Sequence, residues 1–331
     1  MNKTAPKVSV IVPVYNAGER FFKCMDTLVN QSLRELEIIL ILDCPTDGTD
    51  KKAKEYAAKD NRIVIIENKT NLHIGNSRNE GIKVAQGEYI AFSDHDDYRE
   101  LTMYEELYNC AVKEKSDVVL GTSICTGDQN EVLNFPSNLN HEELRDFAIK
   151  NLLAAGDDDN PTPLAAYIHP NLYKTNLIIE NNVFFVDTLK ATPEDIIFQV
   201  QVLFYSQKTS FYSKNLYYHI IHNSSTGSDI YYKLPELRSN GKDILYHFLI
   251  NNSSYNQFKM FFLEGVKKDF TNNLLEFLVM NKNIKSFLKT RKHFKSYPFT
   301  KEAFIKAKYS LGRFRMGGRM LRWILIQWMK I

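Results

Sequence analysis

Acidic side chains at close spacing are the residues in this sequence best suited to chemistry, because carboxylates can hold a metal ion or take up a proton. In the run 94–97 (DHDD), Asp94 and Asp96 are separated by one residue. Mg²⁺ and Mn²⁺ prefer oxygen ligands, and Mg²⁺ is often shared between one or two carboxylates and substrate phosphates. This run is therefore a candidate platform for a metal ion and a diphosphate. Two further acidic groups are Asp43 and the pair Glu194-Asp195.

Each of these groups also has a structural interpretation. An acidic turn can face solvent or cap a helix. Glu194-Asp195 precedes an apolar run, so it could simply supply negative charge to the first turn of a helix. Asp43 and Asp47 could hold a turn through Asx hydrogen bonds. We favour the turn for Asp47 and a ligand contact for Asp43.

The elements that must position these residues alternate between strand and helix. Apolar and β-branched runs predict strands, and apolar residues at helical spacing predict helices between them. The predicted strands are 7–14, 37–42, 62–66, 88–92 and 117–120, and the predicted helices are 21–33, 49–59, 76–85 and 101–114. This alternation is typical of a mostly parallel sheet with flanking helices. Ligands then bind beyond the carboxyl ends of the strands, where the groups at 13–16, 43–49 and 94–97 would meet.

Composition and motifs exclude several classes of protein. The 331 residues are 44% hydrophobic and 24% charged, as in ordinary soluble globular proteins. No apolar run reaches the roughly 18 residues that a membrane-spanning helix needs, and the N-terminus is no signal peptide, so we expect a cytoplasmic protein. Neither a P-loop nor a G-x-G-x-x-G fingerprint is present, so a nucleotide would be held by acidic groups, a metal and backbone.

Charge is distributed unevenly along the chain. Residues 282–331 contain fourteen basic residues and one acidic residue, Glu302, against a net charge of +3 for the whole chain. If residues 312–331 are helical, Arg315, Arg319 and Arg322 share one face and apolar side chains, including Trp328, share the other. This pattern is typical of a helix lying on an anionic membrane surface. The alternative is a helix that packs its apolar face on the protein. A basic face could also attract nucleic acid, but no recognised nucleic-acid-binding fold accompanies it, so we expect no nucleic-acid partner.

Four motifs occur in an order that resembles family 2 glycosyltransferases. They are VSVIVPVYNAG, DCPTDGT, the stretch NLHIGNSRNEGIKVAQGEYIAFSDHDD, and Glu194-Asp195, and the resemblance covers about residues 6–230. It implies the GT-A fold, with a Rossmann-like nucleotide-binding half, and an inverting transfer from a nucleotide-sugar, commonly a UDP-sugar. It also implies an Mn²⁺ or Mg²⁺ cofactor and a glycan or lipid-linked acceptor of cell-surface polysaccharide synthesis.

The same resemblance implies roles for individual residues. Pro13, Val14 and Tyr15 would line the base pocket, and Asp43 would accept from the uracil N3–H. Arg78 would sit near the base and diphosphate, and Asp94 would contact the ribose. Asp96 would ligate the metal, and Asp195 would be the catalytic base.

The sequence departs from the family pattern at the Tyr-rich segment 216–222 (LYYHIIH), which often carries an Arg near the diphosphate. Ile220 occupies that slot here. His219 or His222 could face the diphosphate instead, and the alternative is that they are ordinary loop residues. We take His222 as a candidate contact.

One domain organisation and two candidate functions follow. We expect a catalytic domain over 1–232 and a helical C-terminal region over 233–331 that ends in the basic tail and associates with the inner leaflet of the plasma membrane. The function would be metal-dependent inverting glycosyl transfer. The alternative is a non-catalytic membrane-peripheral scaffold on the same fold, against which the presence of both Asp96 and Asp195 argues.

Overall fold

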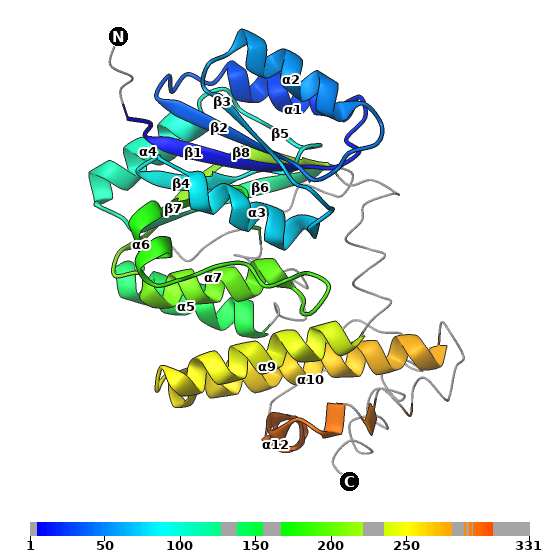
Figure 1. Cartoon of the computed structure of the whole chain (residues 1–331). Helices are drawn as coiled ribbons and strands as arrows, with labels where there is room; N and C mark the ends of the chain where they lie inside the picture. Colours follow the sequence, from blue (N-terminus) through cyan, green and yellow to red (C-terminus); the bar gives the residue numbers. More distant parts are fainter. Residues whose placement is uncertain are drawn as a thin grey trace. The chain divides into compact units, whose positions relative to one another are not determined.

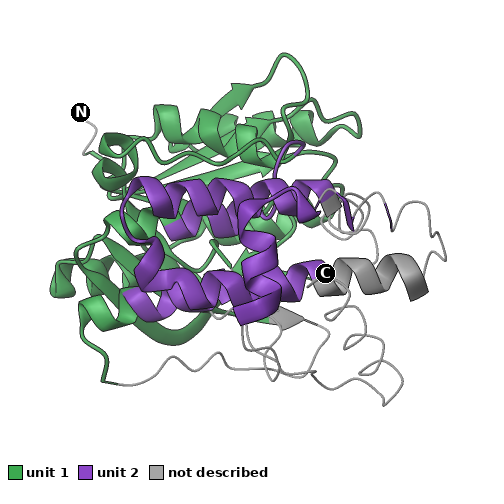
Figure 2. Ribbon diagram, turned by 90° about the horizontal axis from the view of Figure 1, so that it is seen from below, with its two compact units in different colours: residues 1–145, 167–188, 201–223 green, residues 146–166, 189–200, 224–331 purple. Residues whose placement is uncertain are grey.

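The computed structural model describes residues 5–126, 138–154, 167–220, 235–279, 288, 291–292 and 294–306. The chain divides into two compact units, shown in different colours in Figure 2. The first unit consists of residues 1–145, 167–188 and 201–223. The second consists of residues 146–166, 189–200 and 224–331. The boundary at 232/233 therefore stays a prediction, since the second unit also takes two earlier segments.

The first unit is built on one eight-stranded sheet. Its strands run in the order β3-β2-β1-β4-β7-β6-β8-β5. β1, β2, β3 and β4 are parallel to one another, and β6 is parallel to β8, whereas β7 and β5 run antiparallel to their neighbours. The bounds are β1 Val8–Val14, β2 Leu36–Leu42, β3 Ile63–Glu67, β4 Tyr89–Phe92, β5 Tyr98–Arg99, β6 Val118–Thr126, β7 Leu172–Lys174 and β8 Thr209–Ile220.

The register of the parallel strands places the polar clusters at one edge of the sheet. Val14 pairs with Leu42, and Ile11 pairs with Phe92. The ladder continues past the strand ends, because the Asp43 amide donates to Val14 O at 2.9 Å and the Ser93 amide donates to Ile11 O at 3.0 Å. The residues after β1, β2 and β4 therefore leave the sheet on the same side, as the sequence predicts.

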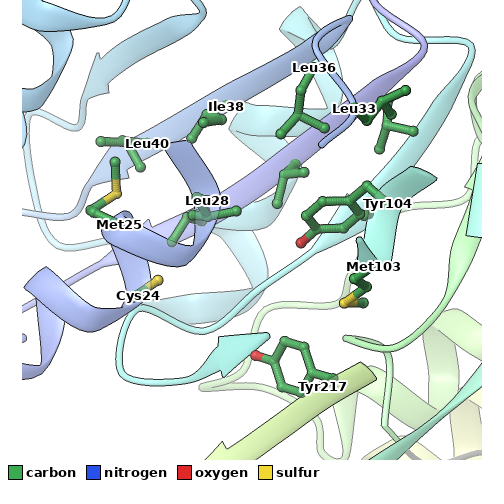
Figure 3. Packing of buried hydrophobic residues seen from close by; sticks show 14 of the residues in the cluster. Cys24, Met25, Leu28, Leu33, Leu36, Ile38, Leu40, Met103, Tyr104 and Tyr217 are labelled. Carbon is green, nitrogen blue, oxygen red and sulfur yellow. The ribbon is translucent and has the colours of Figure 1, made fainter. Parts of the chain in front are cut away.

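Helices cover both faces of this sheet (Figure 1). α1 (Arg20–Val29) and α2 (Thr49–Lys59) lie on one face and α3 (His73–Val84) lies on the other. α1 is amphipathic because its apolar residues recur every three or four positions. Its buried side chains Cys24, Met25 and Leu28 pack against Ile38 and Leu40 of β2 (Figure 3). α4 (Met103–Glu114) adds Met103 and Tyr104 to the same apolar cluster.

The opposite face depends on a close approach between α3 and β1. A Cβ added at Gly81 would lie 2.5 Å from Ile11 Cγ2 and 3.0 Å from Ile11 Cγ1. We expect Gly81→Ala to lower the free energy of unfolding by about 2 kcal/mol, because the gain in helix propensity is smaller than the cost of overpacking. Urea unfolding measures this. In an Ile11→Ala background the added methyl would instead fill the space left by the Ile11 side chain. An equal loss of unfolding free energy in both backgrounds would therefore contradict overpacking as the cause.

The second unit is helical in the part that the structure describes. Its long helices are α9 (Pro235–Asn251) and α10 (Tyr255–Val279), followed by α12 (Pro298–Lys306). Phe262 of α10 meets the rings of Tyr246 and Phe299 at 6.1 and 5.3 Å between centroids. The Lys242 ammonium lies 3.2 Å from an Asp269 carboxylate oxygen, so this buried cation is paired. The predicted C-terminal helical region is confirmed for these residues.

The structure also describes the helices α5 (His141–Ala154), α6 (Thr175–Glu180) and α7 (Glu194–Tyr205). The helix predicted over 21–33 ends at Val29, where the Asn30 amide closes the last turn onto Asp26 O and the buried Gln31 side chain binds Glu100 O. Among the described residues, no helix has the length and apolarity needed to cross a membrane.

Candidate functional site

An acidic turn joins β4 to β5 at the edge where the parallel strands end. Asp97 is fully buried, and the other residues of the turn are partly exposed. The buried Arg99 guanidinium fixes its shape: Nη2 donates to Ser93 Oγ at 2.7 Å and to Asp97 O at 3.2 Å, and Nη1 donates to Cys24 O at 3.2 Å. Arg99 therefore ties the turn to α1, a role that the sequence did not reveal.

Asp94 is held by two nitrogen donors from other parts of the first unit. Arg78 Nη2 lies 3.2 Å from Asp94 Oδ1, and His169 Nε2 lies 3.1 Å from the same oxygen. Burial opposes the charge on Asp94, but His169 and Arg78 outweigh it and hold the pKa of this carboxyl well below its usual range. Arg78 is only 1% exposed, which excludes a surface salt bridge as its role.

Asp97 connects the acidic turn to the end of β8. Its carboxylate accepts hydrogen bonds from Tyr217 Oη at 2.7 Å, from His219 Nδ1 at 3.0 Å and from the Ile220 amide at 2.8 Å. Burial lowers the pKa of His219, but the hydrogen bond and charge of Asp97 outweigh it and raise that pKa to about 9. The sequence singled out His219 as a possible contact, and the structure places it beside the acidic turn.

Several groups here suit a divalent cation. One ligand atom from each of Asp94, Asp97 and His219 lies within 4.8 Å of the others. Burial raises the pKa of Asp96, and the charges of Asp94 and Asp97 add to that rise. Carboxylate oxygens with one imidazole nitrogen are an acceptable ligand set for Mn²⁺ and Mg²⁺, and a cation would relieve the repulsion among the carboxylates. Asp96 is not one of these three residues, and its role as the metal ligand stays a prediction.

The predicted base pocket lies at the ends of β1 and β2. Pro13 and Val14 are buried, whereas the Tyr15 side chain is 44% exposed. His95 Nδ1 lies 3.0 Å from Pro13 O, which links this strand end to the acidic turn. Tyr15 is thus available to a ligand, and the base contact stays a prediction.

Asp43 is buried and organises the start of α3. Its carboxylate accepts from Asn68 Nδ2 at 2.7 Å and from the amides of Leu72 and His73 at 2.7 and 2.9 Å. A carboxylate has about four acceptor positions, so a fourth donor such as a base N–H could still bind. Asp43 therefore has a structural role at the start of α3, which the sequence did not reveal. That role is compatible with the nucleobase contact predicted for Asp43.

Asp47 is a turn residue, as expected. Its carboxylate accepts from the Thr49 amide at 3.0 Å, from Thr49 Oγ1 at 2.6 Å and from the Gly18 amide at 2.9 Å. The Asn16 side chain similarly accepts from the Thr46 amide at 2.7 Å. These bonds hold together the loops that follow β1 and β2.

Asp195 belongs to the second unit, in the first turn of α7 next to the buried Glu194. This position fits the helix-charge interpretation, and the catalytic role of Asp195 stays a prediction. His222 and the tail 312–331 lie outside the described residues.

His169 and Tyr217 are site residues that the sequence analysis missed. Tyr217 lies in the Tyr-rich segment 216–222, and membership of that segment was the available signal. His169 has no such signal, because it lies in a turn 75 residues away from Asp94.

Comparison with known proteins places this geometry in a family. Residues 9–173, which run from within β1 to within β7 and contain the acidic turn, match the model described as glycosyl transferase family 2. The chain belongs to this family. Its sheet, flanking helices and C-terminal helical region are those of the GT-A fold.

Two relatives of this family 2 chain match over 231 residues, or 68% of its length. The uncharacterized glycosyltransferase YibD of Escherichia coli is 31% identical, and the match covers 64% of it. The cholesterol galactosyltransferase of Borreliella burgdorferi is 32% identical, and the match covers 63% of it. The chain thus spans less than two thirds of either relative.

A solved structure shares the fold of the family 2 chain. The crystal structure of S. aureus TarS 1–349 in complex with UDP-GlcNAc has a TM-score of 0.69. It is 21% identical, and the match covers 91% of this chain and 84% of that one.

Proposed function

We propose that this protein is a metal-dependent inverting glycosyltransferase that moves a sugar from a UDP-sugar to a hydroxyl of a glycan or lipid-linked acceptor in cell-surface polysaccharide synthesis. The acidic turn carries the proposal. It gathers Asp94, Asp96 and Asp97 beyond the carboxyl ends of parallel strands, with Arg78 and His219 beside them. The named transferases among the relatives and the UDP-GlcNAc bound by TarS support the substrate class.

The nucleotide would bind along the edge formed by β1, β2 and β4. Pro13, Val14 and Tyr15 would line the base pocket, and Asp43 would accept from the base. The remaining proposed contacts are Arg78 near the base and diphosphate, Asp94 at the ribose, and His222 at the diphosphate in place of the family's Arg. Arg78 and Asp94 support each other here, because the ion pair between them holds both side chains.

A divalent cation would be held by Asp96 together with members of the Asp94, Asp97 and His219 cluster. When bound, it would stabilise the negative charge of the departing diphosphate as a Lewis acid.

The chain's own residues would carry out the proton transfer and orient the reactants. Asp195, as a carboxylate, would take the proton of the acceptor hydroxyl as that oxygen bonds to C1 of the sugar. The C1–oxygen bond to the diphosphate breaks in the same step, and the nucleoside diphosphate leaves from the opposite face. Configuration at C1 is therefore inverted. Arg78 would add positive charge near the diphosphate as negative charge develops there.

The experiment that tests this function measures nucleotide release from a panel of UDP- and GDP-sugars with Mn²⁺. We expect slow hydrolysis of one UDP-sugar, and loss of that release in Asp96→Ala and in Asp195→Ala. The scaffold alternative predicts no release from any donor and no rise in melting temperature with UDP and Mn²⁺. Release from a GDP-sugar alone would contradict the UDP assignment.

We further propose that the basic tail binds the inner leaflet of the plasma membrane, where a lipid-linked acceptor would lie. The support is the sequence of residues 312–331, in which basic and apolar side chains separate at helical spacing. We expect flotation with anionic liposomes at low salt, with about 1 kcal/mol of attraction per basic residue near the surface.

A truncated protein that ends at Ser310 is the control for the tail. It should remain in the unbound fraction, and high salt should release the full-length protein. Equal recovery of both proteins at both salt concentrations would contradict membrane binding through the tail.

A further inference from the structure

His169 is a buried side chain that touches the acidic turn from a distant part of the chain. It is 4% exposed and lies in the turn that precedes β7. Its Nε2 lies 3.1 Å from Asp94 Oδ1 and 3.5 Å from Arg78 Nη2. Because a carboxylate oxygen only accepts, His169 Nε2 carries the hydrogen of this bond. Asp94 Oδ1 therefore accepts from His169 and Arg78 together.

Ring packing fixes the plane of the His169 imidazole. Its centroid lies 5.3 Å from that of Tyr217 at an interplanar angle of 11°, and 6.4 Å from that of His219 at 6°. Tyr217 Oη in turn donates to Asp97 and accepts from the Asp94 amide. The buried Nδ1 of His169 finds no hydrogen-bond partner in the part of the chain that the structure describes. Stacking and the bond to Asp94 are thus the interactions that orient this ring.

The main chain around His169 is also held. Asn171 Oδ1 accepts from the Gly121 amide at 2.9 Å, and Asn171 Nδ2 donates to Tyr167 O at 2.9 Å. A Cβ on Gly121 would lie 2.1 Å from Pro170 O, so β6 approaches this turn as closely as only glycine permits. Hydrogen bonds and close packing therefore hold the turn that carries the His169 imidazole.

We propose that His169 is a positioning residue that holds the Asp94 carboxylate in one orientation for the nucleotide. This inference rests on the proposed function, in which Asp94 contacts the nucleotide. A side chain that is ordered before binding loses no rotamer freedom when the ligand arrives, so prior ordering favours affinity. Hydrogen bonds to charged groups are among the stronger ones in proteins, so loss of this bond should be measurable.

Three substitutions separate the hydrogen bond from the packing. His169→Gln keeps an N–H donor at the distance of Nε2 but removes the ring. His169→Asn carries the same amide on a side chain one methylene shorter, too short to reach Asp94. His169→Phe keeps a flat ring for stacking and removes the donor. Melting temperatures identify any variant that fails to fold, and the Gln and Asn pair then carries the comparison.

The measurements are the Kd for UDP with Mn²⁺ by calorimetry, and the donor KM and kcat of nucleotide release. We expect His169→Phe and His169→Asn to weaken UDP binding and raise KM about tenfold, with kcat within about threefold of the parent. His169→Gln should stay within about threefold for Kd and KM. In an Asp94→Ala background, His169→Phe should change Kd by less than about twofold, because the bond is already lost.

Three results would overturn the inference: unchanged UDP binding in the Phe and Asn variants, equal weakening by Gln and Asn, or an undiminished effect of His169→Phe in the Asp94→Ala background. In each of these cases the parent still binds UDP, so the proposed function stands. No UDP binding by the parent protein would instead overturn the proposed function, and this inference with it.

Discussion

Asp195→Asn is expected to lower kcat about 10³-fold while Kd for UDP stays unchanged, because a positioned general base contributes roughly 10² to 10⁴ to the rate. Asparagine has the shape of aspartate but cannot take the acceptor proton. Binding of the nucleotide does not involve that proton transfer. The measurement is transfer to the acceptor, or nucleotide release where no acceptor is known, together with UDP calorimetry on the same samples.

The alternative for Asp195 is a charge that stabilises the first turn of α7. Under that interpretation Asp195→Asn would cost about 0.3–1 kcal/mol of stability and leave kcat near the parent value. Glu142→Gln is a matched control, since Glu142 is an exposed acid in the first turn of α5. A kcat for Asp195→Asn as high as that of Glu142→Gln would exclude the catalytic role.

Asp97→Asn is expected to destabilise the protein by about 3 kcal/mol, because it breaks a buried charge pair and two of the three hydrogen bonds that this carboxylate accepts. Asp97 Oδ2 accepts from both Tyr217 and His219. An amide nitrogen at that place would face two donors. Urea unfolding measures the loss, and a cost below about 1 kcal/mol would contradict this account of the turn.

The same pair makes stability depend on pH. The pKa of His219 rises from 6.5 to about 9 in the folded protein. A group whose pKa is raised by folding stabilises the folded state below its unfolded pKa, and this contribution is lost as pH rises through the folded pKa. In metal-free buffer, the free energy of unfolding of the parent should therefore fall between pH 6.5 and 9.5 by on the order of 2 kcal/mol more than that of Asp97→Asn.

His247→Gln is the control for this pH dependence, because His247 and Asp243 form an exposed pair 3.6 Å apart. Exposed pairs contribute little, so the loss between the two pH values should match that of the parent. The assignment to His219 would be excluded if Asp97→Asn lost as much stability over this range as the parent does.

Periodicity in the sequence was sufficient to predict most of the first unit. β1, β2 and β4 are buried along their whole length, so each reads as an apolar run that is interrupted only by Ser9 in β1 and Glu37 in β2. The short antiparallel strands β5 and β7 have two and three residues, too few to show a pattern. Their pairing depends on partners far along the chain, as with Tyr98 and Tyr218.

The candidate site likewise contains residues that the sequence predicted and residues that it did not. The acidic turn was found because its carboxylates are adjacent in the sequence and follow a strand. Arg99 and His169 were not found, since a lone Arg or His gives no local sign that it will be buried against a particular carboxylate. The distances of 3.1 Å from His169 to Asp94 and 2.7 Å from Arg99 to Ser93 exist only once the chain has folded.

The sequence by itself determined the parallel sheet, the family resemblance, and the strand edge at which Asp43 and Asp94 lie, because side-chain periodicity and motif order are local properties of the chain. Only the tertiary structure decided which donors hold those carboxylates. The Asp43 carboxylate accepts hydrogen bonds from the start of α3, and the Asp97 carboxylate accepts them from the end of β8. The Asp94 carboxylate is paired with Arg78 and His169. The physical reason is that pairing a buried charge requires groups from separate segments to converge within hydrogen-bond distance, and no local pattern specifies that convergence.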